Sequence, residues 1–298
     1  MIRFERQRKR EKAENDINDR SIVYSPDMKE VVGSAMTMRG ATDDVTSLPR
    51  EISPGIFWMS ACLVVRDGPR FVHNHNSCFL IVGRDSTVLV DNAMPSGWPD
   101  IRDQLAAILR GRTLDYLFPT HPEAPHMGNC GPLMDQYPRA RLVGDLRNYH
   151  LYYPGAEHRF VTMAAGEELD LGGRRLVFVP AVIRDLPNTL WGYDPDARVL
   201  FVSDAYPYTH QHEAGQCGMT AEEMPEAVRP EDTDVVIERA LIWTRYVDAE
   251  VVIEELEAFL ASYPADIIAP SHGGVITNPK ALTAVFQAGL RRVRRSRD

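Results

Sequence analysis

Three side chains that commonly bind metal ions, His121, Glu123 and His126, lie close together in one segment of the chain. Imidazole nitrogens and carboxylate oxygens at this spacing can converge on one cation or on two neighbouring ones. The segment follows an apolar run at residues 114–118, which Pro119 ends, so it is predicted to be a loop that leaves a buried strand. A polar loop that binds no ion can contain the same residue types. Residues elsewhere in the chain are therefore needed to distinguish a metal-binding loop from such a polar loop.

Three further candidate ligands lie at the ends of other predicted strands. Asp185 precedes the strand predicted at residues 189–193. Asp204 directly follows the strand predicted at residues 198–202. His272 follows another apolar run and precedes two glycines, which allow the backbone to approach a site closely. A carboxylate just past a buried strand is either a turn residue or a rigidly held ligand.

Two other pairs of histidines have less specific surroundings. His73 and His75 would share one face of a strand, either as a pair of ligands or as a polar strand entry. His210 and His212 begin the polar segment at residues 207–234, which is long enough to suggest binding or an interface. We predict that His210 or His212 acts as a catalytic proton donor beside the metal site, with a solvent-exposed histidine as the alternative.

The composition restricts the class of protein. A chain of 298 residues with 44% hydrophobic content can bury one large α/β core. Its formal net charge of −9 is unfavourable for a nucleic-acid surface, which needs a positive field. No segment combines the length and apolarity of a membrane span. We therefore expect a protein that binds neither nucleic acid nor membrane.

The cysteines indicate the compartment. Cys62, Cys78, Cys130 and Cys217 are scattered and form no C-x-x-C pair, and the sequence shows no secretory segment. This pattern predicts a cytoplasmic protein with reduced thiols, and it indicates neither a disulfide framework nor a thiolate zinc site.

Strands and helices follow one another from about residue 51 onward. Residues 1–44 are charged and weakly patterned, which predicts an N-terminal arm before one catalytic domain at residues 45–298. Helices are predicted at residues 98–111, 131–137, 249–261 and 279–292. Strands are predicted at residues 56–59, 62–65, 77–82, 86–90, 114–118, 141–144, 168–171, 175–179, 189–193 and 198–202. Ligands in open α/β sheets usually lie at the carboxyl ends of such strands.

With ligand-bearing loops at four strand ends, the chain resembles the metallo-β-lactamase superfamily, and most closely the oxygen-binding diiron domain of the flavodiiron proteins. The superfamily motif is H-x-H-x-D-H and the flavodiiron motif is H-x-E-x-D-H, whereas this chain has His121-Pro-Glu-Ala-Pro-His126. Glu123 agrees with the diiron group. Further similar segments lie at residues 166–173, 186–189, 200–205 and 268–273. The resemblance implies a four-layer αββα sandwich with a dinuclear metal site along one edge of its sheets.

The resemblance also implies a role for each matching ligand. It places His121, Glu123 and Asp185 on one metal ion, His126 and His272 on a second, and Asp204 as a bridge between them. Two positions depart from the family: Pro125 replaces an aspartate, which removes one ligand, and Asp185 replaces a histidine. Three carboxylates beside three imidazoles favour two iron ions, with manganese or zinc as alternatives.

Three functions are compatible with these residues. Our principal expectation is a metal-dependent hydrolase in which a metal-bridging hydroxide attacks a small organic substrate and Asp204 is essential for catalysis. The alternative is a diiron oxidoreductase acting on O2 or NO; because the sequence has no room for the flavodoxin domain of the flavodiiron proteins, a separate partner would supply electrons. The third is a non-catalytic, metal-poor subunit, for which Pro125 is the best argument.

The surroundings of the site suggest its partners. Aromatic residues near the expected rim could line a pocket for a small-molecule substrate, aromatic compounds included; they are Trp98, Tyr152, Tyr153, Trp191, Tyr206, Tyr208 and Trp243. The charged arm could pack against a second copy or a related subunit, so we expect an oligomer.

Overall fold

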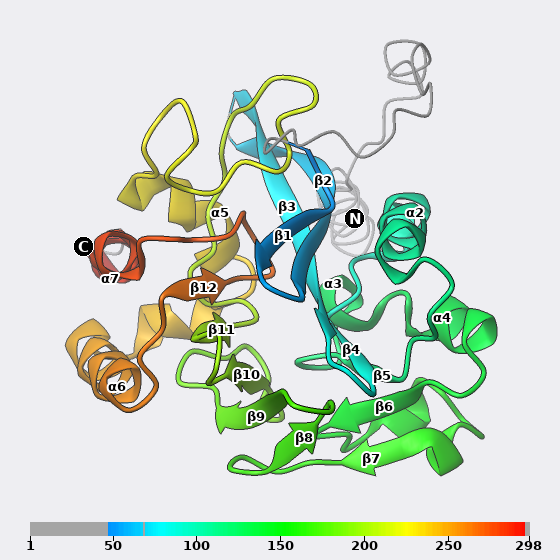
Figure 1. The fold of residues 1–298 in the computed structure, drawn as a ribbon. Coiled ribbons are helices and arrows are strands. Elements are labelled where there is room, and N and C mark those ends of the chain that lie inside the picture. Colours follow the sequence, from blue (N-terminus) through cyan, green and yellow to red (C-terminus); the bar gives the residue numbers. More distant parts are fainter. Residues whose placement is uncertain (1–46, 68, 296–298) are drawn as a thin grey trace, which may run out of the picture. The chain divides into compact units, whose positions relative to one another are not determined.

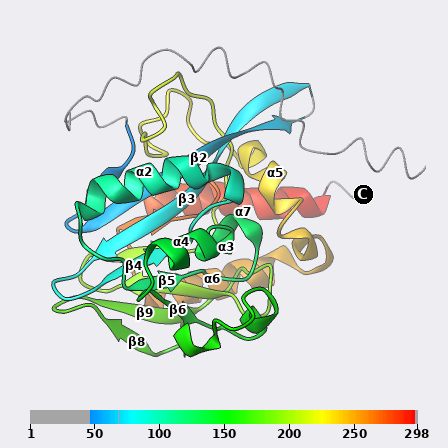
Figure 2. The same cartoon turned by 90° about the vertical axis from the view of Figure 1, so that its right-hand side faces the viewer.

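Two β-sheets pack face to face in the computed structural model, and helices cover the outer side of each sheet (Figures 1 and 2). The structure describes residues 47–67 and 69–295, so the arm expected at residues 1–44 lies outside the described residues. Within the described part, no helix combines the length and apolarity needed to cross a membrane.

The first sheet has seven strands in the order of the sequence. Its first four strands pair antiparallel, and the last three continue the sheet in parallel. The strands are β1 (Arg50–Ser53), β2 (Ile56–Asp67), β3 (Arg70–Val82), β4 (Thr87–Val90), β5 (Tyr116–Phe118), β6 (Arg141–Gly144) and β7 (Phe160–Thr162).

The second sheet has five strands in the order β12-β11-β10-β9-β8. Only the pair β11 and β12 is parallel; the other neighbours are antiparallel. The strands are β8 (Glu168–Asp170), β9 (Arg175–Pro180), β10 (Leu190–Asp194), β11 (Val199–Phe201) and β12 (Ile267–Ala269).

Among the residues that the structure describes, the helices are short except for three. The α-helices are α2 (Trp98–Leu109), α3 (Ala124–Met127), α4 (Cys130–Gln136), α5 (Asp234–Ile237), α6 (Ala249–Ser262) and α7 (Pro279–Arg295). The 3-10 helices are η2 (Pro95–Gly97), η3 (Tyr149–Leu151), η4 (Glu157–Arg159), η5 (Pro230–Thr233) and η6 (Ile242–Tyr246).

Three apolar clusters separate four layers. Ile101 of α2 belongs to the cluster on the outer face of the first sheet. Between the sheets, Phe118 of β5 meets Phe178 of β9 edge-on, with ring centroids 4.8 Å apart. On the outer face of the second sheet, Trp191 of β10 packs against Phe259 of α6, with centroids 5.1 Å apart. The predicted four-layer αββα sandwich is confirmed.

The β2–β3 ribbon is longer than the sequence predicted. We expected two separate strands at residues 56–59 and 62–65, but β2 is continuous, and β3 already begins at Arg70. The two strands pair through backbone hydrogen bonds along their whole length, from the pair Ile56 and Ile81 to the pair Asp67 and Arg70. Long-range pairing thus extends strands through polar residues that local patterning assigns to loops.

An ion pair holds the segment after β11 to the first sheet. Arg50 of β1 donates from Nη2 to Oε1 of Glu223 over 2.9 Å and from Nη1 to the carbonyl oxygen of Gly218 over 2.8 Å. The hydrogen bond from Arg50 lowers the pKa of Glu223 from 4.5 to about 2. Since the carboxylate is the favoured form in the folded state, the stabilisation is fully present above pH 4.5 and disappears as the pH falls towards 2.

Replacing Glu223 with glutamine should therefore reduce the free energy of unfolding by about 0.5 kcal/mol near neutral pH, as is typical of a partly exposed ion pair. The difference between the variant and the wild type should vanish as the pH approaches 2, where the wild-type carboxylate is also protonated. Urea unfolding of both proteins at a series of pH values measures this difference. A difference that is constant with pH would show that the ion pair contributes nothing.

Candidate metal centre

Two histidines and one aspartate from two separate segments converge where strands of both sheets end. His121 lies after β5, His126 lies in α3, and Asp204 follows β11. His121 Nε2 is 3.4 Å from one carboxylate oxygen of Asp204, and His126 Nε2 is 3.0 Å from the other. All three side chains are buried, with no more than 1% of their surface exposed. Asp204 thus lies between the imidazoles of His121 and His126.

Two more carboxylates extend this cluster on the side of His121. Glu123 Oε2 is 4.0 Å from His121 Nε2. The potential ligand atoms of His121, Glu123 and Asp185 all lie within 4.8 Å of one another. Both carboxylates are only partly buried, so this side of the cluster reaches solvent.

His272, after β12, completes the set on the opposite side. Its Nε2 is 3.2 Å from Oδ1 of Asp204, the oxygen that His126 also contacts. The structure therefore brings together all six side chains that the sequence predicted as metal ligands. Pro125 lies in the first turn of α3 and offers no ligand atom there.

The outer nitrogens of both inner histidines are bound by protein groups. His121 Nδ1 is 3.1 Å from the hydroxyl oxygen of Ser203, and His126 Nδ1 is 2.9 Å from Oδ2 of Asp91. Such contacts fix the ring orientation, and the acceptor carboxylate of Asp91 fixes the tautomer with its proton on Nδ1. In both rings, Nε2 is the nitrogen that faces Asp204.

Asp91 is a supporting residue that the sequence analysis missed. Besides His126, it accepts hydrogen bonds from the backbone nitrogen of Thr120, 2.8 Å away, and from the hydroxyl of Ser271. It follows β4 with a φ of 54°, a left-handed conformation that turns the chain at the strand end. Its position directly after an apolar strand was the available signal, because the same rule identified Asp204.

The charges of the cluster favour binding of a cation. Burial, together with the charge of His126, lowers the pKa of His121 to about 3, so its imidazole is neutral. Although burial opposes ionisation, His126 and His121 keep the pKa of Asp204 well below its ordinary value. Burial, and then the charges of Asp204 and Glu123, raise the pKa of Asp185 to about 7. A cation would relieve this crowding of carboxylates.

Unsatisfied polar atoms also fit a metal ion. Among the described residues, His121 Nε2, Asp185 Oδ1 and Asp204 Oδ2 are buried atoms without a hydrogen-bond partner. Leaving a buried polar atom unpaired is costly, whereas each of these atoms is a good metal ligand. The residues present therefore fit a metal centre rich in carboxylates.

Two of the predicted catalytic residues have different neighbours from those we expected. The ring of His210 is 4.5 Å from that of His75, and the ring of His212 is 4.1 Å from that of His73. The structure thus groups His210 and His212 with β3 and not with the carboxylates. The long excursion after β11 carries them there, because the backbone of His210 forms an antiparallel bridge with that of His73.

Several aromatic residues expected at the rim are core residues. Trp191, Tyr206 and Tyr208 are almost completely buried and belong to the apolar cluster on the outer face of the second sheet. They cannot form the wall of an open substrate pocket. Tyr152 is an exposed aromatic residue of the expected set.

Comparison with known proteins relates this arrangement to one family. The family described as ODP family beta lactamase matches residues 74–273. A nitric oxide reductase of Moorella thermoacetica is 27% identical over 54% of this chain and 42% of its own length. A coenzyme F420H(2) oxidase of Methanothermobacter marburgensis is 23% identical over 80% of this chain and 60% of its own length.

Solved structures give the same fold. The rubredoxin:oxygen oxidoreductase of Desulfovibrio gigas superposes with a TM-score of 0.66 at 15% identity, over 82% of this chain and 61% of the other. The predicted relation to the metallo-β-lactamase superfamily and to flavodiiron proteins is confirmed. The chain spans about half of the length of the two curated relatives described above.

Our principal expectation of a hydrolase was wrong. The two relatives described above are a nitric oxide reductase and an oxidase, and the structural neighbour is an oxidoreductase. The expectation relied on hydrolysis being common among proteins with this fold, and a fold by itself does not determine chemistry. The alternative with diiron chemistry agrees better with these findings.

Proposed function

Because this chain belongs to the ODP family of proteins with the β-lactamase fold, we propose that it is a diiron oxidoreductase that acts on O2 or NO. The observation that most strongly supports iron is the convergence of Glu123, Asp185 and Asp204 with His121, His126 and His272. Equal numbers of carboxylates and imidazoles suit iron, which prefers harder ligands than an all-imidazole site offers.

We assign the six ligands as follows. His121, Glu123 and Asp185 would hold one iron ion, His126 and His272 the other, and Asp204 would contact both, because each of its oxygens faces a different histidine. Two iron ions held there would supply the electrons that reduce the bound gas. Ser203 and Asp91 keep the inner histidines oriented so that Nε2 remains available.

Solvent can reach the site on the side of Glu123, where 43% of the side-chain surface is exposed. His121, His126 and Asp204 lie deep in the structure and exclude water from the other side. This exposed side is the route that we propose for a small diatomic substrate. We propose that the electrons come from a separate partner protein, and that the chain forms a homo-oligomer.

The first experiment is anaerobic purification, followed by elemental analysis and absorption spectra before and after reduction. We expect stoichiometric iron, a spectrum that responds to reduction, and consumption of NO or O2 that requires both iron and an electron donor such as reduced viologen. Redox-silent iron, or NO and O2 consumption no faster than in the iron-depleted protein, would contradict the proposal. A protein without stoichiometric metal would favour the non-catalytic subunit, for which Pro125 remains the argument.

A further inference from the structure

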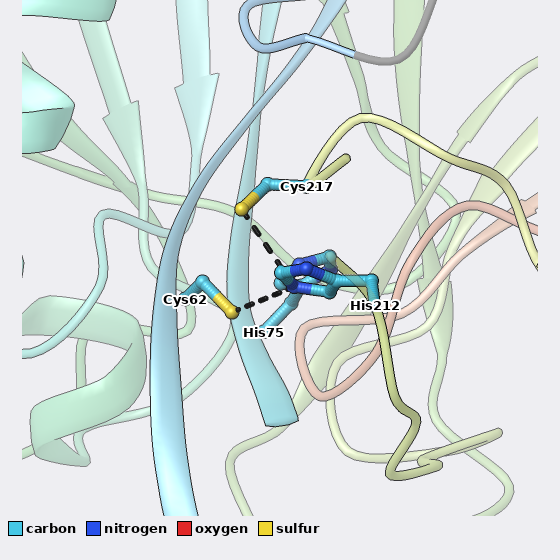
Figure 3. A group of neighbouring side chains, drawn as sticks. All are labelled: Cys62, His75, His212 and Cys217. Atoms are coloured by element: carbon cyan, nitrogen blue, oxygen red, sulfur yellow. Dashed lines mark hydrogen bonds between the residues drawn. The ribbon is translucent and has the colours of Figure 1, made fainter. Parts of the chain in front are cut away.

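Two cysteines and two histidines form a second cluster of potential ligands, separate from the carboxylate site. Cys62 of β2 lies directly opposite His75 of β3 in the antiparallel ribbon. His212 and Cys217 reach the same point from the excursion after β11 (Figure 3). One potential ligand atom from each of the four side chains lies within 4.8 Å of all the others. Four ligands from three distant segments thus surround one point.

The distances in this cluster match those of a tetrahedral zinc site. The Nε2 atom of His212 is 3.3 Å from the sulfur of Cys62 and 3.7 Å from the sulfur of Cys217. In a tetrahedral site, Zn–S bonds of about 2.3 Å and Zn–N bonds of about 2.0 Å place sulfur and nitrogen about 3.5 Å apart. An ion could therefore occupy the centre without a large movement of these side chains.

The tautomer of His212 is the one that a metal requires. Its Nδ1 is 2.9 Å from the carbonyl oxygen of Glu213, so Nδ1 donates the proton to that oxygen. The free lone pair is then on Nε2, which faces both sulfurs. The Nδ1 atom of His73 is 3.3 Å from the sulfur of Cys62 and can donate to its thiolate. Contacts of this kind orient ligands and stabilise thiolates at metal sites.

His75 provides an independent reason to expect an ion. It is completely buried, and within the described part of the chain neither of its ring nitrogens forms a well-directed hydrogen bond. A potential ligand nitrogen of His75 lies within 4.8 Å of the sulfur of Cys217. A neutral imidazole without a partner is costly in a protein interior but is an excellent zinc ligand.

Two other arrangements of these four side chains would leave more of their polar atoms without a partner. An imidazolium–thiolate pair between His212 and Cys217 could satisfy one ring nitrogen of His75 through the sulfur, but it would leave the other nitrogen unsatisfied. A disulfide between Cys62 and Cys217 would leave both histidines without a partner, and all four cysteines of the structure are free. A single metal ion satisfies all four side chains together.

We infer that Cys62, His75, His212 and Cys217 bind a zinc ion in a closed structural site, which fastens the excursion after β11 to the β2–β3 ribbon. Thiolate sulfur is a soft ligand that selects zinc, whereas the carboxylate-rich centre selects iron, so one chain would hold two different metals in two chemically distinct sites. The inference departs from the expectation, based on the absence of a C-x-x-C pair, that the cysteines form no thiolate zinc site, because Cys62 and Cys217 are distant in sequence but close together in the fold.

The test is metal analysis of the purified, reduced protein and of four variants. We expect stoichiometric zinc in the wild type, a loss of more than tenfold in zinc occupancy in Cys62→Ala and Cys217→Ala, and no loss in Cys78→Ala, which removes a buried cysteine from the same ribbon. The variant Asp204→Ala should keep this zinc, which distinguishes it from metal bound at the carboxylate centre.

A measurement on the wild type does not depend on the folding of variants. Titration with a mercurial reagent should release zinc in proportion to the modification of two thiols, and cobalt substitution should give the near-ultraviolet charge-transfer absorption of a thiolate complex. Reduced protein that binds no added zinc, zinc that persists in both cysteine variants, or a Cys62–Cys217 disulfide in the freshly purified protein would each overturn the inference. Iron content and gas consumption are measured separately, so failure of the proposed function would not be mistaken for failure of this site.

Discussion

Replacing Asp204 with alanine should weaken iron binding by more than about 100-fold and remove nearly all consumption of NO or O2. Both oxygens of this carboxylate are engaged: one faces His121, and the other faces His126 and His272. No other side chain in the described structure occupies a comparable position between the histidines, so nothing can take over its role. Iron content and affinity, measured by competition with a chelator, test this expectation directly.

The matched control is Asp194→Ala. Asp194 is equally buried, but it caps a turn after β10, where its Oδ1 accepts from the backbone nitrogens of Asp196 and Ala197. Its removal should lower the free energy of unfolding by about 3 kcal/mol, because two hydrogen bonds to a buried carboxylate and the ion pair of its Oδ2 with Nε of Arg174, 3.3 Å away, are lost, and it should leave iron binding unchanged. Equal iron loss in both variants would mean that Asp204 acts only through stability, and normal iron content in Asp204→Ala would refute the proposed bridge.

Replacing Asp91 with asparagine should reduce iron affinity by about 10- to 100-fold, although Asp91 is not expected to contact the metal. An amide preserves the shape of the side chain but removes the negative charge beside Nδ1 of His126. Although burial acts in the opposite direction, the carboxylates of Asp91 and Asp204 raise the pKa of His126 well above its ordinary value. Without the Asp91 carboxylate, the ring is a weaker electron donor and can adopt the other tautomer.

Iron affinity by chelator competition and the visible spectrum of the iron form would show this change, since a ring that turns or changes tautomer alters the spectrum. The variant Asp194→Asn serves as the control, because it makes the same substitution in another buried carboxylate. Full affinity with an unchanged spectrum in Asp91→Asn would show that Ser203 and Thr120 alone are sufficient to hold the inner histidines.

The sequence alone predicted the ligands of the carboxylate centre because their signals are local. Apolar runs end at residues 118 and 202, and a histidine or carboxylate stands two or three residues after each. In α/β sheets the ends of neighbouring strands meet at one edge, so ligand types at strand ends indicate a shared site before any contact is known. The motif with Glu123 also resembled that of the diiron group more than the usual motif of the superfamily.

These local sequence signals could not distinguish hydrolysis from redox chemistry. The same carboxylates and imidazoles can hold a metal ion that activates water or one that transfers electrons. The residue types of the ligands are therefore compatible with both reactions. Only comparison with an oxidase and a nitric oxide reductase separated the two.

Only the tertiary structure showed which side chains surround the six candidate ligands. It also showed that two cysteines and two histidines form a second cluster. Cys62 faces His75 only because β2 and β3 pair in one particular register, and Cys217 reaches them only because the excursion after β11 folds back over the ribbon. Strand register and the path of a long loop depend on contacts between residues that are far apart in sequence, and they leave no periodic pattern. The periodicity of the chain therefore predicted the layers, and the residue types at the strand ends indicated the carboxylate cluster, whereas the Cys–His cluster became visible only in the folded structure.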